Sequence, residues 1–183
     1  MIELKKVLGI TGSPRRGANT ETMIDQILTG AKESGAQTEK VILSEMNVNP
    51  CRACNGCQRT GQCVIDDDFG SILEKMKESN VWVLGTPVYW WGPTAQMKAF
   101  IDRWYGVERS TFRGKEIILT VSSNGGTSYA RYTVDMLESI IPYLGMRHIA
   151  TIQAAGTTGP NYAKNNDTLM EKAYRTGKEV VQG

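Results

Sequence analysis

The residues from Ile10 to Thr20 bring glycine, hydroxyl, amide and guanidinium groups together in the run Ile-Thr-Gly-Ser-Pro-Arg-Arg-Gly-Ala-Asn-Thr. An apolar segment precedes this loop and an amphipathic one follows it. A loop between a strand and a helix presents free backbone N–H groups, and the positive end of the helix dipole, to one point in space. The sequence therefore predicts an anion site here, with a phosphate as its usual occupant.

The same loop indicates which phosphate compounds it does not suit. A nucleoside triphosphate loop of the G-x-x-x-x-G-K-[S/T] type needs a lysine and a hydroxyl residue, but here Ala18 and Asn19 follow Gly12 and Gly17. The dinucleotide pattern G-x-G-x-x-G is not supplied by the residues that begin at Gly9. A terminal monophosphate is the ligand class that remains.

Four side chains in the loop could bind such a monophosphate. Ser13 and Thr20 offer hydroxyl groups, and Arg15 offers a fork of N–H donors for phosphate oxygens. Asn19 offers an amide or a helix N-cap. The alternative is an ordinary strand-to-helix turn in which Asn19 only caps the helix.

A second loop, Thr86 to Pro93, carries three consecutive aromatic residues, Tyr89, Trp90 and Trp91. Aromatic side chains exposed in a loop lower solubility unless a flat ring system or a partner subunit covers them. The alternative is that all three pack beneath the following helix, as most aromatic residues do. Three consecutive side chains cannot all point the same way, so we expect at least one to face a ligand or an interface.

The four cysteines of the chain lie within thirteen residues, with the spacing C-x2-C-x2-C-x5-C: Cys51, Cys54, Cys57 and Cys63. Thiolates at this spacing can wrap one compact iron–sulfur cubane, although in ferredoxin segments the fourth cysteine usually ligates a different cluster. Zinc sites more often use two separated C-x2-C pairs. The alternative is that the thiols are free or redox-active, on an insertion that shapes a pocket or a subunit interface.

The composition limits the classes of function. A chain of 183 residues suits one domain, residues 1–183, with a substantial core. A formal net charge of +2 with interspersed signs gives no reason to expect nucleic acid or a membrane as partner. The start, Met1 to Lys6, does not resemble a signal peptide, because its apolar stretch is interrupted. We therefore expect a soluble cytoplasmic protein whose cysteines form no structural disulfides.

The elements that must position these loops alternate regularly along the chain. Apolar segments followed by amphipathic ones indicate a doubly wound α/β fold, with a five-stranded parallel sheet and helices on both faces. Right-handed crossovers favour the flavodoxin-like strand order 2-1-3-4-5, with residues 44–67 as a cysteine-containing insertion after the second strand. The expected strands are Lys6–Thr11, Gln37–Leu43, Val81–Gly85, Lys115–Val121 and Arg147–Ala154.

In such a sheet, ligands bind beyond the carboxyl ends of the strands. Three polar or glycine-rich loops are expected to meet there: Gly12–Thr20, Thr86–Gly92 and Ser122–Thr127. Asp67 or Asp68 is expected to cap the helix that follows the insertion. Pro93 fits the first position of the next helix.

Taken together, these motifs resemble the NADPH-dependent FMN reductase superfamily over essentially the whole chain. The resemblance rests on Gly12–Thr20, on Thr86–Lys98 and on Phe100-Ile-Asp-Arg103. Within that superfamily, the cysteine run Pro50–Cys63 followed by Asp66-Asp-Asp68 is similar to the iron–sulfur flavoprotein branch.

The resemblance implies FMN as the cofactor and a nicotinamide, NADH or NADPH, as its donor. The residues implied to hold the FMN phosphate are Ser13, Arg15, Asn19 and Thr20. Those implied to line the isoalloxazine are Pro87, Val88, Tyr89, Trp90, Trp91 and Gly92. Those implied to contact its pyrimidine edge are Ser123, Asn124, Gly125, Gly126 and Thr127. The branch further implies a [4Fe–4S] cluster on Cys51, Cys54, Cys57 and Cys63.

The leading hypothesis is an FMN-containing, NAD(P)H-dependent oxidoreductase that passes electrons to a second acceptor: flavin, quinone, metal ion or protein. The alternative is an iron–sulfur flavoprotein acting as a one-electron carrier, partnered by a ferredoxin. A third hypothesis is a non-redox scaffold whose cysteines bind zinc. We expect no catalytic side chain, because cofactor and substrate supply the reacting atoms. The exposed aromatic residues predict a homodimer or homotetramer.

Overall fold

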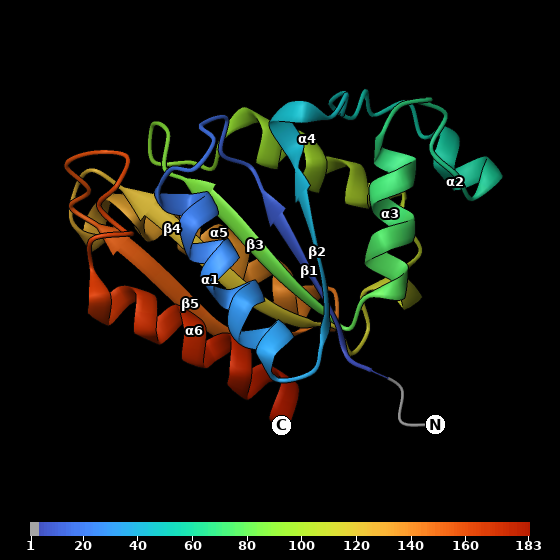
Figure 1. Cartoon of the computed structure of the whole chain (residues 1–183). Coiled ribbons are helices and arrows are strands. Elements are labelled where there is room, and N and C mark those ends of the chain that lie inside the picture. The colour runs from blue at the N-terminus through green and yellow to red at the C-terminus, as the bar shows by residue number, and fades with distance from the viewer. Residues whose placement is uncertain (1–3) are drawn as a thin grey trace.

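The computed structural model describes residues 4–183. Residues 1–3 lie outside the described part, and with them the first half of the segment Met1 to Lys6 that does not resemble a signal peptide. Five strands form one parallel sheet in the order β2-β1-β3-β4-β5, which confirms the predicted flavodoxin-like fold (Figure 1). The strands are β1 (Lys6–Thr11), β2 (Gln37–Ile42), β3 (Val81–Pro87), β4 (Glu116–Ser123) and β5 (Arg147–Ala155).

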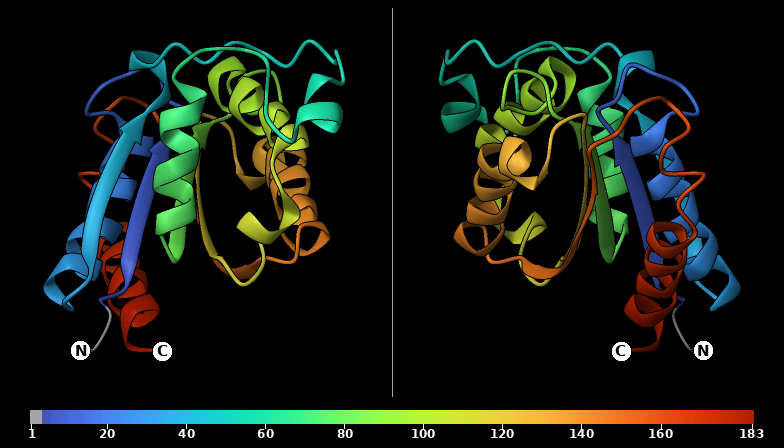
Figure 2. Two further views of the ribbon diagram at one scale, coloured as in Figure 1. Left: turned by 90° about the vertical axis from the view of Figure 1, so that its right-hand side faces the viewer. Right: turned by 90° about the vertical axis from the view of Figure 1, so that its left-hand side faces the viewer.

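Helices cover both faces of the sheet. The α-helices are α1 (Asn19–Glu33), α2 (Gly56–Thr60), α3 (Phe69–Glu78), α4 (Ala95–Asp102), α5 (Thr127–Tyr143) and α6 (Asp167–Gln182). The short 3-10 helices are η1 (Leu43–Glu45), η2 (Arg103–Gly106) and η3 (Arg109–Thr111). Helices α1 and α6 pack on one face, and α3, α4 and α5 on the other (Figure 2). No helix within residues 4–183 is long and apolar enough to cross a membrane.

The central strands explain why the two layers hold together. In β3, Trp82 and Leu84 pack into the core beneath α3, α4 and α5, whereas Val81 and Val83 pack into the core beneath α1 and α6. Successive strand residues point to opposite faces, so a strand between two helical layers must be apolar at nearly every position. Each of these side chains is buried, and the carboxyl ends of the strands are thereby fixed side by side.

The structure corrects the expected start of the helix after Pro93, whereas the helix after the insertion starts at one of the two expected capping residues, Asp68. Pro93 does not occupy a first helical position, because Thr94 is the N-cap of α4 and accepts a hydrogen bond from the N–H of Met97 at 3.3 Å. Asp68 occupies the N-cap of α3 without a side-chain cap bond, and Asp67 accepts from the N–H of Phe69 at 3.2 Å instead. Helix α2, inside the cysteine-rich segment, was not expected. Three strands extend beyond their predicted carboxyl ends: β3 to Pro87, β4 to Ser123 and β5 to Ala155. Strand β2 ends one residue earlier than predicted, at Ile42, and β4 begins one residue later, at Glu116.

Helix α1 touches α6 through glycine. A Cβ added at Gly177 would lie 2.0 Å from the carbonyl oxygen of Ile27, a backbone atom that cannot turn aside. We therefore expect Gly177→Ala to lower the free energy of unfolding by about 1–3 kcal/mol through overpacking, measured by urea denaturation. Gly70 in α3 is the control, since a Cβ there meets nothing within 4 Å. Its replacement by alanine should raise stability by about 0.5–1 kcal/mol, and equal losses at both positions would contradict the close contact.

Candidate functional site

Loops from four strand ends surround a pocket of about 250 Å³ at the carboxyl edge of the sheet, the upper edge in Figure 1. We call it the four-loop pocket. It is lined by Ser13, Arg15, Ala18, Asn19, Thr20, Pro87, Val88, Tyr89, Ser122, Ser123, Asn124, Thr157 and Pro160. The three loops expected from the sequence thus meet in one place, and a fourth joins them.

The first turn of α1 opens into this pocket without a side-chain cap. Its N-cap position is Ala18, which has no side-chain acceptor to offer. Within residues 4–183, the N–H groups of Asn19 and Thr20 find no hydrogen-bond acceptor, although both residues are buried. Buried N–H groups without partners are costly, and at a helix start they favour an anion.

Neighbouring elements fix the entry of the loop. The N–H of Gly12 donates to the carbonyl of Gly85 in β3 at 2.7 Å, and the hydroxyl of Thr94 donates to the carbonyl of Gly12 at 2.7 Å. The hydroxyl of Ser13 accepts from the N–H of Arg15 at 3.2 Å. Ser13 therefore shapes the loop as well as lining the pocket.

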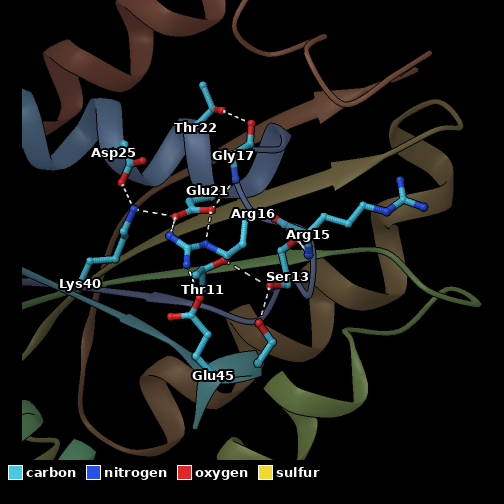
Figure 3. A network of polar contacts seen from close by, with 11 residues as sticks. Thr11, Ser13, Arg15, Arg16, Gly17, Glu21, Thr22, Asp25, Lys40 and Glu45 are labelled. Atoms are coloured by element: carbon cyan, nitrogen blue, oxygen red, sulfur yellow. Dashed lines mark hydrogen bonds and ion pairs between the residues drawn. The ribbon is translucent and has the colours of Figure 1, made fainter.

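Glu21 fixes the far end of the loop from inside α1 (Figure 3). Its buried carboxylate accepts a fork from Arg16, with Nε and Nη2 at 3.2 and 3.1 Å. It also accepts from the N–H of Gly17 at 2.6 Å and from Nζ of Lys40 at 2.7 Å. Gly17 has a φ of +63°, a left-handed conformation that glycine adopts without strain. This turn directs the N–H of Gly17 to the carboxylate of Glu21.

The network joins two cations, Arg16 and Lys40, to three carboxylates, so its formal charge is −1. Lys40 also pairs with Asp25 at 2.6 Å, and Arg16 also pairs with Glu45. Burial opposes ionisation of Glu21, but the hydrogen bonds from Arg16, Lys40 and Gly17 outweigh it and lower its pKa to about 2. Glu21 is therefore an anion at every physiological pH.

The two adjacent arginines of the loop have different environments. Figure 3 shows Arg16 turned into the network around Glu21, while Arg15 extends away from it. Arg15 lines the four-loop pocket and has no ion-pair partner within the described part of the chain. Arg15 is thus the cation that remains available to a bound anion.

The aromatic loop is a two-residue hairpin that only partly reaches the pocket. Tyr89 and Gly92 exchange backbone hydrogen bonds at 2.9 and 3.0 Å, and Trp90 and Trp91 form the tip with φ values of 50° and 62°. Pro87, Val88 and Tyr89 line the pocket, whereas Trp90, Trp91 and Gly92 do not. Trp90 is 91% exposed. Trp91 stacks on Tyr129 of α5, with ring centroids 6.0 Å apart.

The third loop divides in the same way. Ser123 and Asn124 line the pocket, and Gly125, Gly126 and Thr127 lie outside its lining. The hydroxyl groups of Thr20 and Ser122, both buried, are 2.9 Å apart and tie the first loop to the end of β4.

The fourth loop follows β5, and the sequence analysis missed it. Thr157 and Pro160 line the pocket. Asn19 holds this loop: its amide donates to the carbonyl of Gly159 at 2.8 Å, and its oxygen accepts from the N–H of Ala163 at 2.9 Å. Asn19 therefore ties two loops together rather than capping its helix. The signal that could have found this loop is its position after the fifth strand, at the same edge of the sheet.

The four cysteines are free thiols on the segment that runs from β2 over the carboxyl edge to α3. Thiol chemistry suits iron, but the placement does not: within residues 4–183, no three Cys, His, Asp or Glu side chains are grouped closely enough to hold a metal ion. The sulfur of Cys51 accepts from the N–H of Ala53 at 3.4 Å. As placed, the residues do not form a finished cluster site.

Comparisons with known proteins agree with the sequence resemblance. A family model described as NADPH-dependent FMN reductase matches residues 5–160. The chain is 41% identical to an iron–sulfur flavoprotein of Methanosarcina thermophila, over 96% of this chain and 93% of that one. It is 35% identical to an iron–sulfur flavoprotein of Methanocaldococcus jannaschii, over 97% and 96% of the two chains.

A solved structure supports the fold. The NAD(P)H:quinone oxidoreductase from Methanothermobacter marburgensis matches with a TM-score of 0.78 at 17% identity, over 97% of this chain and 96% of that chain.

Proposed function

Because the chain belongs to the NADPH-dependent FMN reductase family, we propose that it binds FMN in the four-loop pocket and uses it to oxidise NADH or NADPH. The observation that carries this proposal is the uncapped start of α1: Asn19 and Thr20 line the pocket beside Arg15, and their N–H groups have no acceptor within residues 4–183. A phosphate monoester would satisfy them. Membership of this family makes the chain a flavin-dependent oxidoreductase.

Each loop then has a distinct task. Ser13, Arg15 and Thr20 would bind the phosphate, and Asn19 would fix the neighbouring loop. Pro87 to Tyr89 would support one side of the ring system, and Ser123 and Asn124 would offer polar groups to its edge. When bound, FMN supplies the hydride chemistry, so the protein needs to orient it and exclude water rather than provide a catalytic side chain.

The second acceptor is proposed to be a flavin, a quinone, a metal ion or a protein. An open pocket used in turn by donor and acceptor would give ping-pong kinetics. The exposed Trp90 favours a homodimer or homotetramer with an interface beside the pocket.

A second candidate function is one-electron transfer between FMN, a [4Fe–4S] cluster and a ferredoxin. Two relatives that match nearly the whole chain are named iron–sulfur flavoproteins, and the chain carries four closely spaced cysteines. Because the thiols do not converge in this structure, we derive no step through a cluster.

An anaerobic absorption spectrum of the protein, before and after addition of NADH or NADPH, tests the proposal. We expect flavin bands that the nicotinamide bleaches rapidly. Bleaching only by a low-potential protein donor, together with about four iron and four sulfide per chain, would favour the carrier instead. A protein that binds no FMN after reconstitution would overturn both functions.

A further inference from the structure

The two ends of the cysteine-rich segment are joined by protein contacts alone. The carboxylate of Asp67 accepts hydrogen bonds from the N–H of Asn49 at 2.9 Å and from its side-chain amide at 3.3 Å. Next to this pair, the carboxylate of Asp68 accepts from the N–H of Asn47 at 2.7 Å, and the N–H of Asp68 donates to the carbonyl of Asn47 at 3.0 Å. Residues 50–66, which carry every cysteine, therefore form a loop with a closed base.

Arg103, at the start of η2, binds both ends of this loop. Its Nη1 donates to the carbonyl of Asn49 at 2.9 Å and to Asp67 at 2.7 Å, and its Nη2 donates to the carbonyl of Ile65 at 3.4 Å. The side chains of Arg103 and Asp67 are 1% and 0% exposed. The guanidinium also lies 4.6 Å from the ring centroid of Phe69. Cys63 also lies beside the guanidinium, whose Nε has no hydrogen-bond partner within residues 4–183. A buried arginine with these partners is a structural link, because its charge is expensive to bury and is offset mainly by the loop ends and the ring.

The middle of the loop is held less firmly than its base. One hydrogen bond joins it to η2, from the hydroxyl of Tyr105 to Asn55 at 3.2 Å, and Gly106 lies against Cys57. Ala53 and Asn55 adopt left-handed conformations, with φ values of 52° and 55°. A cavity of about 540 Å³ lies beside the loop, and both Cys63 and Arg103 line it. The part of the loop around Cys63 therefore borders open space, while the ends of the loop are fixed.

We propose that Arg103 is a positioning residue that, with Asp67, closes the base of the cysteine loop so that only residues 50–66 need to rearrange when the thiols gather around a metal group. Fixing the ends in advance lowers the conformational entropy that the loop loses when its ligands converge. The inference rests on the proposed function only where it invokes iron; the closure of the base is a property of the protein itself.

Limited trypsin digestion of the metal-free, FMN-loaded protein tests this closure. Arg52 and Arg59 are exposed cleavage sites inside the loop. We expect Arg103→Met to speed cleavage at these two sites about tenfold or more, because local opening of the loop becomes easier. Arg103→Lys keeps a cation beside Asp67 but cannot bridge both ends, so an intermediate rate is expected. After anaerobic incubation with ferrous iron and sulfide, both variants should retain less than half of the iron that the unmodified protein retains.

Arg109→Met is the matched control. Arg109 also combines one carbonyl hydrogen bond, to Tyr143 at 3.1 Å, with a stacked aromatic ring, but it does not contact the cysteine loop. The control should cleave at the unmodified rate, and an unchanged FMN content shows that each variant is folded. If Arg103→Met does not fold, the Arg103→Lys rate decides. Unmodified cleavage rates in folded Arg103 variants would overturn the proposal. An unmodified protein that takes up no iron would remove the cluster from the proposed function and leave the cleavage result to decide the closure.

Discussion

Replacing Ser13 and Arg15 together by alanine should raise the Kd for FMN about 30- to 1000-fold. Arg15 would contribute a charge-assisted hydrogen bond to the phosphate, worth about 1.5–3 kcal/mol, and Ser13 a neutral one worth about 0.5–1.5 kcal/mol. Arg15 has no ion-pair partner within residues 4–183 that would compete for it. The measurement is a fluorescence titration of the apoprotein with FMN.

Riboflavin, which lacks the phosphate, separates binding of the phosphate from damage to the pocket. The double variant should bind riboflavin as the unmodified protein does, so that the preference for FMN collapses. A matched control removes one hydroxyl and one guanidinium far from the pocket, with Ser139→Ala and Arg175→Ala on the exposed surfaces of α5 and α6. Equal weakening of FMN and riboflavin would show that the phosphate is bound elsewhere.

The sequence was sufficient to predict the strand order of the sheet and the edge of the sheet at which the candidate site lies. Apolar strands followed by amphipathic helices leave few parallel topologies, and the switch point then follows from the strand order. Lys6–Thr11 is a strand with the predicted bounds, because charged residues before the apolar run and a glycine-rich loop after it mark both ends of the strand. Local patterns therefore predicted which loops would meet.

Contacts between distant residues could not be predicted in this way. Asn19 binds the loop at Gly159, 140 residues away, and from its type and position it resembles a local helix cap. Arg103 and Asp67 resemble surface charges, yet they form a buried pair across 36 residues. The sequence signal for that pair is the position of Arg103 among the large apolar residues Phe100, Ile101 and Trp104. Such pairings depend on how the helices pack against the sheet and against each other, which residue type and periodicity do not specify.

Glu21→Gln should lower the free energy of unfolding by about 2–3 kcal/mol at neutral pH. Its pKa of about 2, against an ordinary value of 4.5, corresponds to about 3 kcal/mol of stabilisation of the folded state. Because the folded pKa is depressed, this contribution is present above about pH 4.5 and is lost as the pH falls toward 2. Urea denaturation at several pH values should therefore show the difference between the two proteins shrinking across that interval.

Asp25→Asn is the control, because Asp25 lies one turn further along α1 and also binds Lys40, but is half exposed and does not touch the loop. Its effect should stay below about 1 kcal/mol, the range of exposed ion pairs. A difference between Glu21→Gln and the unmodified protein that persists at pH 2 would contradict the charged network.

The same substitution has two opposed effects on FMN binding. It frees positive charge on Arg16 and Lys40 near the phosphate site, which favours an anion, but by less than about 1 kcal/mol for groups that water and salt screen. It also loosens the turn at Gly17, whose N–H loses its carboxylate, and each backbone residue that must then be ordered on binding costs about 1–2 kcal/mol. The second effect is larger, so we expect the Kd for FMN to rise about tenfold, with the rise becoming larger at high salt, where the charge effect is screened. Tighter binding of FMN by the variant than by the unmodified protein at low salt would mean that Glu21 opposes the phosphate rather than holding the loop that binds it.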